Sequence, residues 1–211
     1  DSLAIGMSPF LMNLAACFIV IIINQGLKKY GGDLAIGAFG IVNRLVFIVV
    51  MIVMGLNQGM QPIAGYNFGA KLYGRVNKVL RLTIIYATAV TTFGFLVGML
   101  VPDLVVGIFT SDAELTELSV TGLRITVMFF PIIGFQMVTS NFFQSIGMAG
   151  KAIFLSLTRQ MLILLPCLLV LPQFFGVAGV WYSMPVSDLL ASLIALVMLV
   201  CQFRKFRTSP L

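Results

Sequence analysis

Three ionisable side chains lie deep inside long apolar runs of this sequence: Arg44, Arg159 and Asp188. A charge at the centre of a bilayer costs about 2.5–3.5 kcal/mol, so each of them needs a partner or a wet cavity. Counting at ~1.5 Å per residue puts Arg159 and Asp188 at depths that an arginine side chain can bridge between adjacent antiparallel helices. We therefore predict an Arg159–Asp188 pair, with Arg44 as a further supporting charge. Direct binding of a proton or cation by Asp188 is the alternative interpretation.

A second set of side chains follows helical spacing. Steps of 4, 4, 3, 4 and 3 residues bring six of them to one helix face: Asn43, Phe47, Met51, Met54, Gln58 and Gln61. Gln136 and Ser140 share a face of a later run, and Asn13 lies in the first run. Such stripes commonly form interhelical hydrogen bonds worth ~0.6–2 kcal/mol. The competing interpretation is a substrate cavity, because Met, Phe and amide side chains suit varied apolar and cationic ligands.

The residue inventory excludes several kinds of chemistry. The chain has no histidine and no paired carboxylates inside its apolar runs, so it offers neither a Ser-His-Asp site nor an imidazole metal site. The cysteines lie singly in apolar runs and are interpreted as small buried hydrophobes: Cys17, Cys167 and Cys201. We therefore predict no catalytic residues, no metal ligands and no cofactor, and we do not expect an enzyme.

The composition places these residues in a membrane. Hydrophobic residues make up 60% of the 211 positions, charged residues make up 9%, and the mean hydropathy is +1.08. A spanning helix needs ~20 mostly apolar residues, and six runs meet that length: 8–27, 34–60, 79–101, 118–143, 151–171 and 177–201. The runs are continuous rather than alternating, which favours helices over a β-barrel. We predict an all-α integral membrane protein in which residues 1–211 form a single transmembrane lobe.

The net charge of +6 is divided unevenly between the two ends of these runs. The side that carries both termini holds most of the basic residues: Lys71, Arg75, Lys78, Arg81, Lys151, Arg204, Lys205 and Arg207. The opposite loops hold Lys28 and Lys29. Because basic loops stay on the cytoplasmic side, both termini are predicted to be cytoplasmic, and the charge fits a bilayer rather than a nucleic acid. Residues 70–82 combine apolar and basic positions at helical spacing, which predicts an amphipathic helix at the cytoplasmic headgroup surface.

Prolines and glycines indicate where the spans bend and approach one another. Four prolines in or at the ends of the runs are predicted to kink helices: Pro62, Pro131, Pro166 and Pro185. Glycines four residues apart allow close helix packing, as at Gly55/Gly59 and Gly94/Gly98. The spacing of Ser111 and Glu114 is that of a capping box and predicts a helix start near Ser111.

Several motifs occur in one order along the chain. They are GLNQGMQPIAGYNFGAK at 55–71, FTSDAE at 109–114, FQSIG at 143–147, Arg159-Gln160, GVAGVW at 176–181 and PVSD at 185–188. This combination covers nearly the whole chain and resembles the second half of multidrug and toxic compound extrusion (MATE) transporters. The resemblance implies a twelve-span protein of two six-helix lobes, with this chain as the C-terminal lobe, spans 7–12.

The resemblance also implies an activity. It is that of a cation-coupled antiporter, using Na⁺ or H⁺, that exports amphipathic and often cationic drugs from the bacterial inner membrane by alternating access. The implied partners are the lipid bilayer, the N-terminal six-helix lobe and amphipathic organic cations. One branch of the family has its coupling carboxylate in the first span of the other lobe. Another branch has acids in the seventh and tenth spans, and the corresponding runs here, 8–27 and 118–143, contain no such mid-span acid.

Two alternative functions are open at this point. A lipid-linked oligosaccharide flippase of the same superfamily would share the lobe but is expected to need a more cationic cavity for pyrophosphate, and here Arg44 and Arg159 are opposed by Asp188. A half-length membrane subunit that does not transport is the second alternative. A second six-span unit in the gene upstream of residue 1 would favour the transporter.

Overall fold

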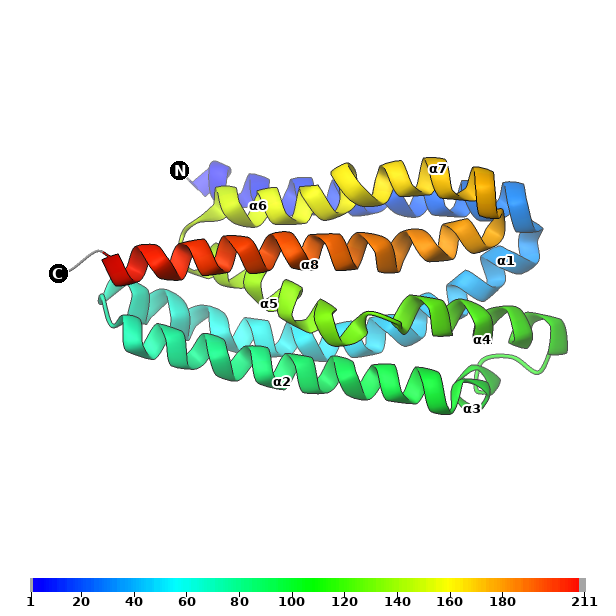
Figure 1. Ribbon diagram of the computed structural model, residues 1–211, viewed down its shortest axis with the longest axis horizontal. Helices are drawn as coiled ribbons and strands as arrows, with labels where there is room; N and C mark the ends of the chain where they lie inside the picture. Colours follow the sequence, from blue (N-terminus) through cyan, green and yellow to red (C-terminus); the bar gives the residue numbers. More distant parts are fainter. Residues whose placement is uncertain (1, 209–211) are drawn as a thin grey trace.

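The computed structural model describes the backbone of residues 2–208 and the side chains of Phe10 and residues 13–202 (Figure 1). These residues form a helical bundle, which confirms the predicted all-α fold. Its elements are α1 (Ser2–Gly69), α2 (Tyr73–Leu100), α3 (Pro102–Gly107), α4 (Ala113–Val127), α5 (Phe130–Ser145), α6 (Ala149–Leu157), the π-helix η1 (Thr158–Leu164), α7 (Leu165–Phe175) and α8 (Val177–Thr208). The side chains of Arg204, Lys205 and Arg207 lie outside the described residues.

Helix α1 consists of two arms that meet at Gly32, where the chain reverses direction (Figure 1). Gly32 has φ 67° and ψ −162°, a conformation that is essentially restricted to glycine. A straight helix over the 57 residues Asn13–Gly69 would be about 86 Å long, far more than the ~30 Å hydrocarbon core of a bilayer. The two arms, 2–31 and 33–69, therefore provide two crossings and contain the predicted runs 8–27 and 34–60.

Within the described part of the chain, four helices are long and apolar enough to cross a membrane, or five when the bent pair α4 and α5 counts as one span. Because α1 doubles back at Gly32, these helices make six crossings. They are the two arms of α1, helix α2, the pair α4 and α5, the continuous stretch Ala149–Phe175, and helix α8. Helices α4 and α5 are bent by 55° at Met128 and Phe129, so the predicted run 118–143 is a broken span. Pro131 in the first turn of α5 explains the break, because it lacks an N–H and its ring clashes with the preceding turn.

The predicted amphipathic helix over 70–82 is not a separate element, because most of it is the first part of α2. Residues 70–72 form a turn, and one helix then runs without interruption from Tyr73 to Leu100. Residues 75–93 contain neither proline nor glycine, so the helical hydrogen-bond ladder has no reason to break there. The basic residues are therefore carried on the first turns of a spanning helix rather than on a separate surface helix.

The start of α4 also differs slightly from the prediction. The helix begins at Ala113, and its N-cap is Asp112 rather than Ser111. The Asp112 carboxylate accepts a hydrogen bond from the backbone N–H of Leu115 at 3.0 Å. A carboxylate at this position satisfies an unpaired helix donor and also interacts favourably with the helix dipole.

Two clusters of buried side chains form the core. The first includes Trp181 and Phe39, whose ring centroids are 5.9 Å apart. The second includes Phe142 and Phe143 of α5, also 5.9 Å apart. Because α5 packs against α1, α2, α6 and α8, it joins the other spans through these contacts.

The predicted close packing at glycine is confirmed for the pair in α2. A Cβ on Gly94 would lie 2.9 Å from the Val49 side chain, and one on Gly98 would lie 3.1 Å from that of Val127. These glycines let α1 and α4 approach α2. On α1, two glycines of the predicted packing motif have no neighbour within 4 Å of a built Cβ: Gly55 and Gly59.

Candidate functional site

Arg159 and Asp188 form an ion pair inside the bundle. Both Nε and Nη2 of Arg159 lie 2.7 Å from the same carboxylate oxygen, Oδ1, of Asp188. The Asp188 side chain is 6% exposed and that of Arg159 is 32% exposed. Charge-assisted hydrogen bonds of this kind are stronger than neutral ones and offset part of the cost of burying two charges. The contact joins η1 to α8 and is the juxtaposition predicted from the depths of the two residues.

The arginine is carried by the π-helix η1, which lies between α6 and α7. Pro166 follows it and has no N–H to donate to the preceding turn, so a local change of hydrogen-bond register is accommodated there. Within η1, Thr158 Oγ1 and Gln160 Oε1 are buried and lack a hydrogen-bond partner. The arginine of the ion pair therefore has an unsatisfied polar side chain on either side of it in the sequence.

The predicted stripe lies on an open face of the second arm of α1. Phe47 is 55% exposed, Met51 57% and Met54 46%. Asn43 and Gln58 are also exposed, and Gln61 is half-buried. Because amides are costly to place in hydrocarbon, an exposed face with this composition requires a protein partner or water beside it. We call Asn43, Phe47, Met51, Met54, Gln58 and Gln61 the α1 stripe.

The other predicted cavity residues are placed differently. Gln136 and Ser140 of α5 are only 4% and 7% exposed, so they do not share an open surface with the α1 stripe. The Ser140 hydroxyl lies 3.2 Å from that of Ser156, which joins α5 to α6. Burial follows from the central position of α5, which sequence spacing alone does not reveal. Asn13 is exposed on the first arm of α1.

Asn57 is a buried polar residue of α1 that was not among the predicted site residues. It is 2% exposed, and neither its Oδ1 nor its Nδ2 has a hydrogen-bond partner. An unsatisfied buried amide costs roughly 1–3 kcal/mol and is a common feature of functional positions. An amide inside an apolar run was the available signal, but Asn57 was not included in the α1 stripe, and it is buried.

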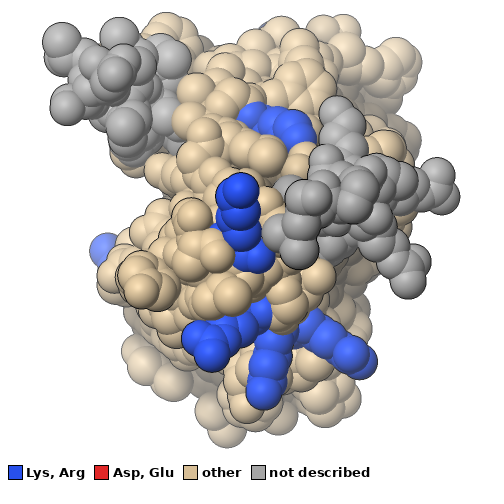
Figure 2. All heavy atoms as spheres, turned by 90° about the vertical axis from the view of Figure 1, so that its left-hand side faces the viewer, with Lys and Arg blue, Asp and Glu red and all other residues tan. Residues whose placement is uncertain are grey.

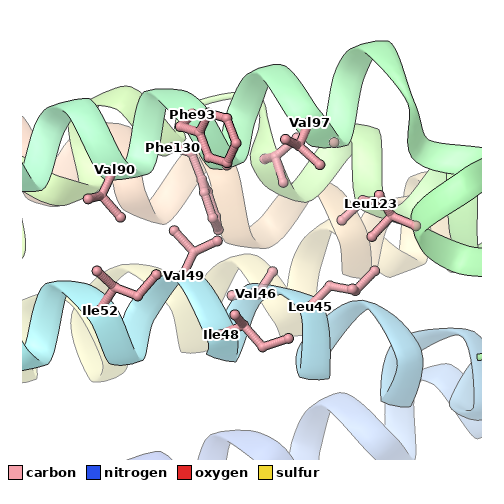
Figure 3. A pocket seen from close by; sticks show the side chains of 14 residues that line it. Leu45, Val46, Ile48, Val49, Ile52, Val90, Phe93, Val97, Leu123 and Phe130 are labelled. Atoms are coloured by element: carbon pink, nitrogen blue, oxygen red, sulfur yellow. The ribbon is translucent and has the colours of Figure 1, made fainter. Parts of the chain in front are cut away.

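An apolar crevice lies beside the α1 stripe (Figure 3). It has a volume of about 230 Å³. Figure 3 shows side chains of α1 and α2 facing each other across it, with Phe130 of α5 and Leu123 of α4 also pointing toward it. Gly94 and Gly98 belong to its wall, where they pack closely against Val49 and Val127. Sequence spacing did not predict this crevice.

Arg44 and the prolines complete the predicted set. Arg44 is exposed on α1 next to the stripe and does not take part in the Arg159–Asp188 pair. Pro131 coincides with the α4–α5 break and Pro166 with the end of η1. Pro62 and Pro185 lie inside α1 and α8, and both helices continue through them.

These features define a class of protein. The chain is a polytopic helical membrane protein with an internal ion pair, broken and irregular spans, and one open face that carries amide, thioether and aromatic side chains. Irregular helices inside a membrane are tolerated where they are buried in protein or line a cavity, and they are typical of transporters.

Comparison with known proteins identifies the family. The family model MatE matches residues 8–169, and the chain belongs to this family. Multidrug export protein MepA of Staphylococcus aureus (strain MSSA476) is 29% identical over 192 residues, which are 91% of this chain and 42% of MepA. The structure of MATE multidrug transporter DinF-BH in complex with R6G matches with a TM-score of 0.84 and 36% identity, over 97% of this chain and 46% of that one.

A more distant structure supports the fold. An outward-facing multidrug resistance MATE family transporter of the MOP superfamily has a TM-score of 0.89 at 18% identity. The chain spans less than half the length of the relatives and structures that it matches. The predicted family is therefore confirmed, and so is the predicted architecture of one helical lobe that amounts to about half of such a transporter.

Proposed function

We propose that this chain forms one lobe of a cation-coupled antiporter that exports amphipathic, often cationic, drugs by alternating access. The observation that carries the proposal is the open α1 stripe in a lobe of the MatE family. Aromatic rings attract organic cations, thioethers adapt to ligands of different shape, and amides supply hydrogen bonds. MepA is a multidrug export protein and DinF-BH was solved with R6G, which supports a substrate class of this kind.

The partner of the α1 stripe is proposed to be the N-terminal six-helix lobe of the same protein. Phe47 and Met51 are more than half exposed, and Gly55 and Gly59 lie on the same arm without neighbours. Glycines such as Gly55 and Gly59, on a helix face that no other described helix of this chain contacts closely, allow a further helix to approach. A cavity between the two lobes would hydrate the amides and give substrates access to the rings.

The coupling ion is proposed to be Na⁺ or H⁺, bound in the other lobe. Within this lobe the charge of Asp188 is compensated by Arg159 at 2.7 Å, which supports a structural role for the pair. Engagement of Arg159 also argues against an oligosaccharide flippase, which would need unoccupied basic side chains for a pyrophosphate. Arg44 is proposed to support the open face electrostatically.

The protein is proposed to lie in the bacterial cytoplasmic membrane with both ends of this chain in the cytoplasm. Figure 2 views the end of the bundle where both termini lie, and the charged atoms visible there among the described residues belong to Lys and Arg. The acids Asp33, Asp103, Asp112 and Glu114 occur at the opposite turns. This separation supports the predicted orientation, because basic residues favour the cytoplasmic side.

Transport is tested with the complete gene expressed in drug-sensitive bacteria. We expect R6G accumulation to fall, and to rise again when an uncoupler of the proton gradient or removal of sodium abolishes the driving force. In the α1 stripe, Met51→Ala together with Gln58→Leu should weaken export several-fold, whereas Leu169→Ala on the exposed surface of α7 should not. Unchanged accumulation by correctly inserted protein would contradict the proposed function.

A further inference from the structure

The exposed side of α2 changes character along its length. Its first turns expose Arg75, Lys78 and Arg81, whereas the next turns expose Ile85 and Tyr86. Since α2 is one uninterrupted helix, this change marks the level at which the helix passes from headgroups into hydrocarbon. Residues near Arg81 therefore lie at the boundary between the two layers.

A groove crosses this boundary. It has a volume of about 370 Å³ and is lined by Asn77, Leu80, Arg81, Ile84 and Ile85. Asn77 and Arg81 form its end nearer the helix start, and the two isoleucines lie about 5 Å further along the helix. The surface that lines the groove is almost entirely apolar, and Asn77 and Arg81 are the residues with hydrogen-bonding groups at its end nearer the headgroups.

The charged residues around the groove favour a negatively charged ligand. Lys78 lies one turn from Arg81, and Lys71, Arg75 and Lys151 belong to the same end of the bundle. Figure 2 shows Lys and Arg side chains gathered on this end, with no Asp or Glu in view among the described residues. A cationic drug would be repelled here, whereas an anion would be attracted, because basic residues near the membrane surface favour anionic lipids.

We propose that this groove is a binding site for an anionic phospholipid of the cytoplasmic leaflet. Arg81 and Asn77 bind the phosphate, because a guanidinium presents several donors in a geometry that matches phosphate oxygens. The first part of an acyl chain lies along Ile84 and Ile85. This lipid site goes beyond the proposed export function. A lipid bound there would hold the first turns of α2 at a fixed depth in the membrane.

The test is lipid binding to the complete gene product in detergent, measured by native mass spectrometry with dioleoyl phosphatidylglycerol and dioleoyl phosphatidylcholine. We expect phosphatidylglycerol to bind at least fivefold more tightly, and Arg81→Gln to weaken its binding about fivefold. Arg75→Gln is the matched control, because it removes the same charge from the same helix at a position about 1.7 turns before Arg81 that does not line the groove. It should change binding less than twofold.

Three results would overturn the proposal. Equal losses in the Arg81→Gln and Arg75→Gln variants would indicate a diffuse positive field instead of a site. Equal binding of the two lipids would remove the requirement for an anion. Glycerol phosphate has a headgroup but no acyl chain. If it displaced phosphatidylglycerol at concentrations as low as those at which the lipid binds, Ile84 and Ile85 would have no role in binding. If Arg81→Gln does not fold, Asn77→Ala removes no charge and should still weaken phosphatidylglycerol binding.

Discussion

Gly134 of α5 lies against the backbone of Ala87 in α2. A Cβ built on Gly134 would come within 2.8 Å of the Ala87 carbonyl oxygen and within 2.7 Å of Thr91 Oγ1. Gly134 follows Pro131 by one turn, so the bend between α4 and α5 brings this segment directly onto α2. The close approach thus depends on a residue without a side chain immediately after the break.

Gly134→Ala should therefore destabilise the lobe. A carbonyl oxygen cannot move aside as a side chain can, so the helices must separate, and overpacking of this kind costs about 1–3 kcal/mol. We expect a lower midpoint of thermal unfolding, measured by size-exclusion chromatography of heated detergent samples. Gly150→Ala is the control, since Gly150 is exposed and a Cβ there meets nothing within 4 Å. Similar midpoints for both variants would argue against the close contact.

Asp188→Ala should also lower stability, because it leaves Arg159 without its partner in the interior. Removing one member of a buried pair costs about 3–5 kcal/mol, and we expect the lower end because Arg159 is 32% exposed. The same heating assay measures the loss. The exchanged pair, Arg159→Asp with Asp188→Arg, should recover part of it. A double variant that is no more stable than either single one would contradict a stabilising pair.

The α1 stripe is expected to be accessible to water. In a background without Cys17, Cys167 and Cys201, Met51→Cys should react with a water-soluble maleimide, because the reagent attacks the thiolate and this forms poorly in lipid. Leu169→Cys, exposed on α7, should react much more slowly if it faces lipid. Saturating R6G should protect Met51→Cys. Equal labelling at the two positions would place the stripe in the lipid.

Orientation is tested by labelling intact cells. Ser111→Cys, in the turn before α4, should react with a membrane-impermeant maleimide added outside. Asn77→Cys, on the exposed first turns of α2, should react only after the cells are opened. The opposite pattern would reverse the predicted positions of both termini. This experiment is independent of transport activity.

The sequence predicted the spanning helices of this protein better than the bends and connections between them. Continuous apolar runs indicate spanning helices, because a hydrated backbone cannot cross hydrocarbon. Kinks were predicted at four prolines, and the structure has irregularities at Pro131 and Pro166, whereas α1 and α8 continue as helices through Pro62 and Pro185. Which proline interrupts a helix depends on how the surrounding structure accommodates the missing N–H, and that information is not local. The amphipathic residues 70–82 were recognised, but their continuity with the third span was not.

For the candidate site, the spacing of residues was sufficient to identify the candidate side chains. The spacing of the α1 stripe and the depths of Arg159 and Asp188 follow from helix geometry alone, and the family follows from the order of motifs. Which of these side chains are exposed and which are buried followed from the packing of the helices. Gln136 and Ser140 are buried because α5 lies among four other helices, whereas Asn57 of α1 is buried although the stripe on the same arm is open. Burial is a property of packed neighbours, and helical periodicity specifies a face but not what covers it.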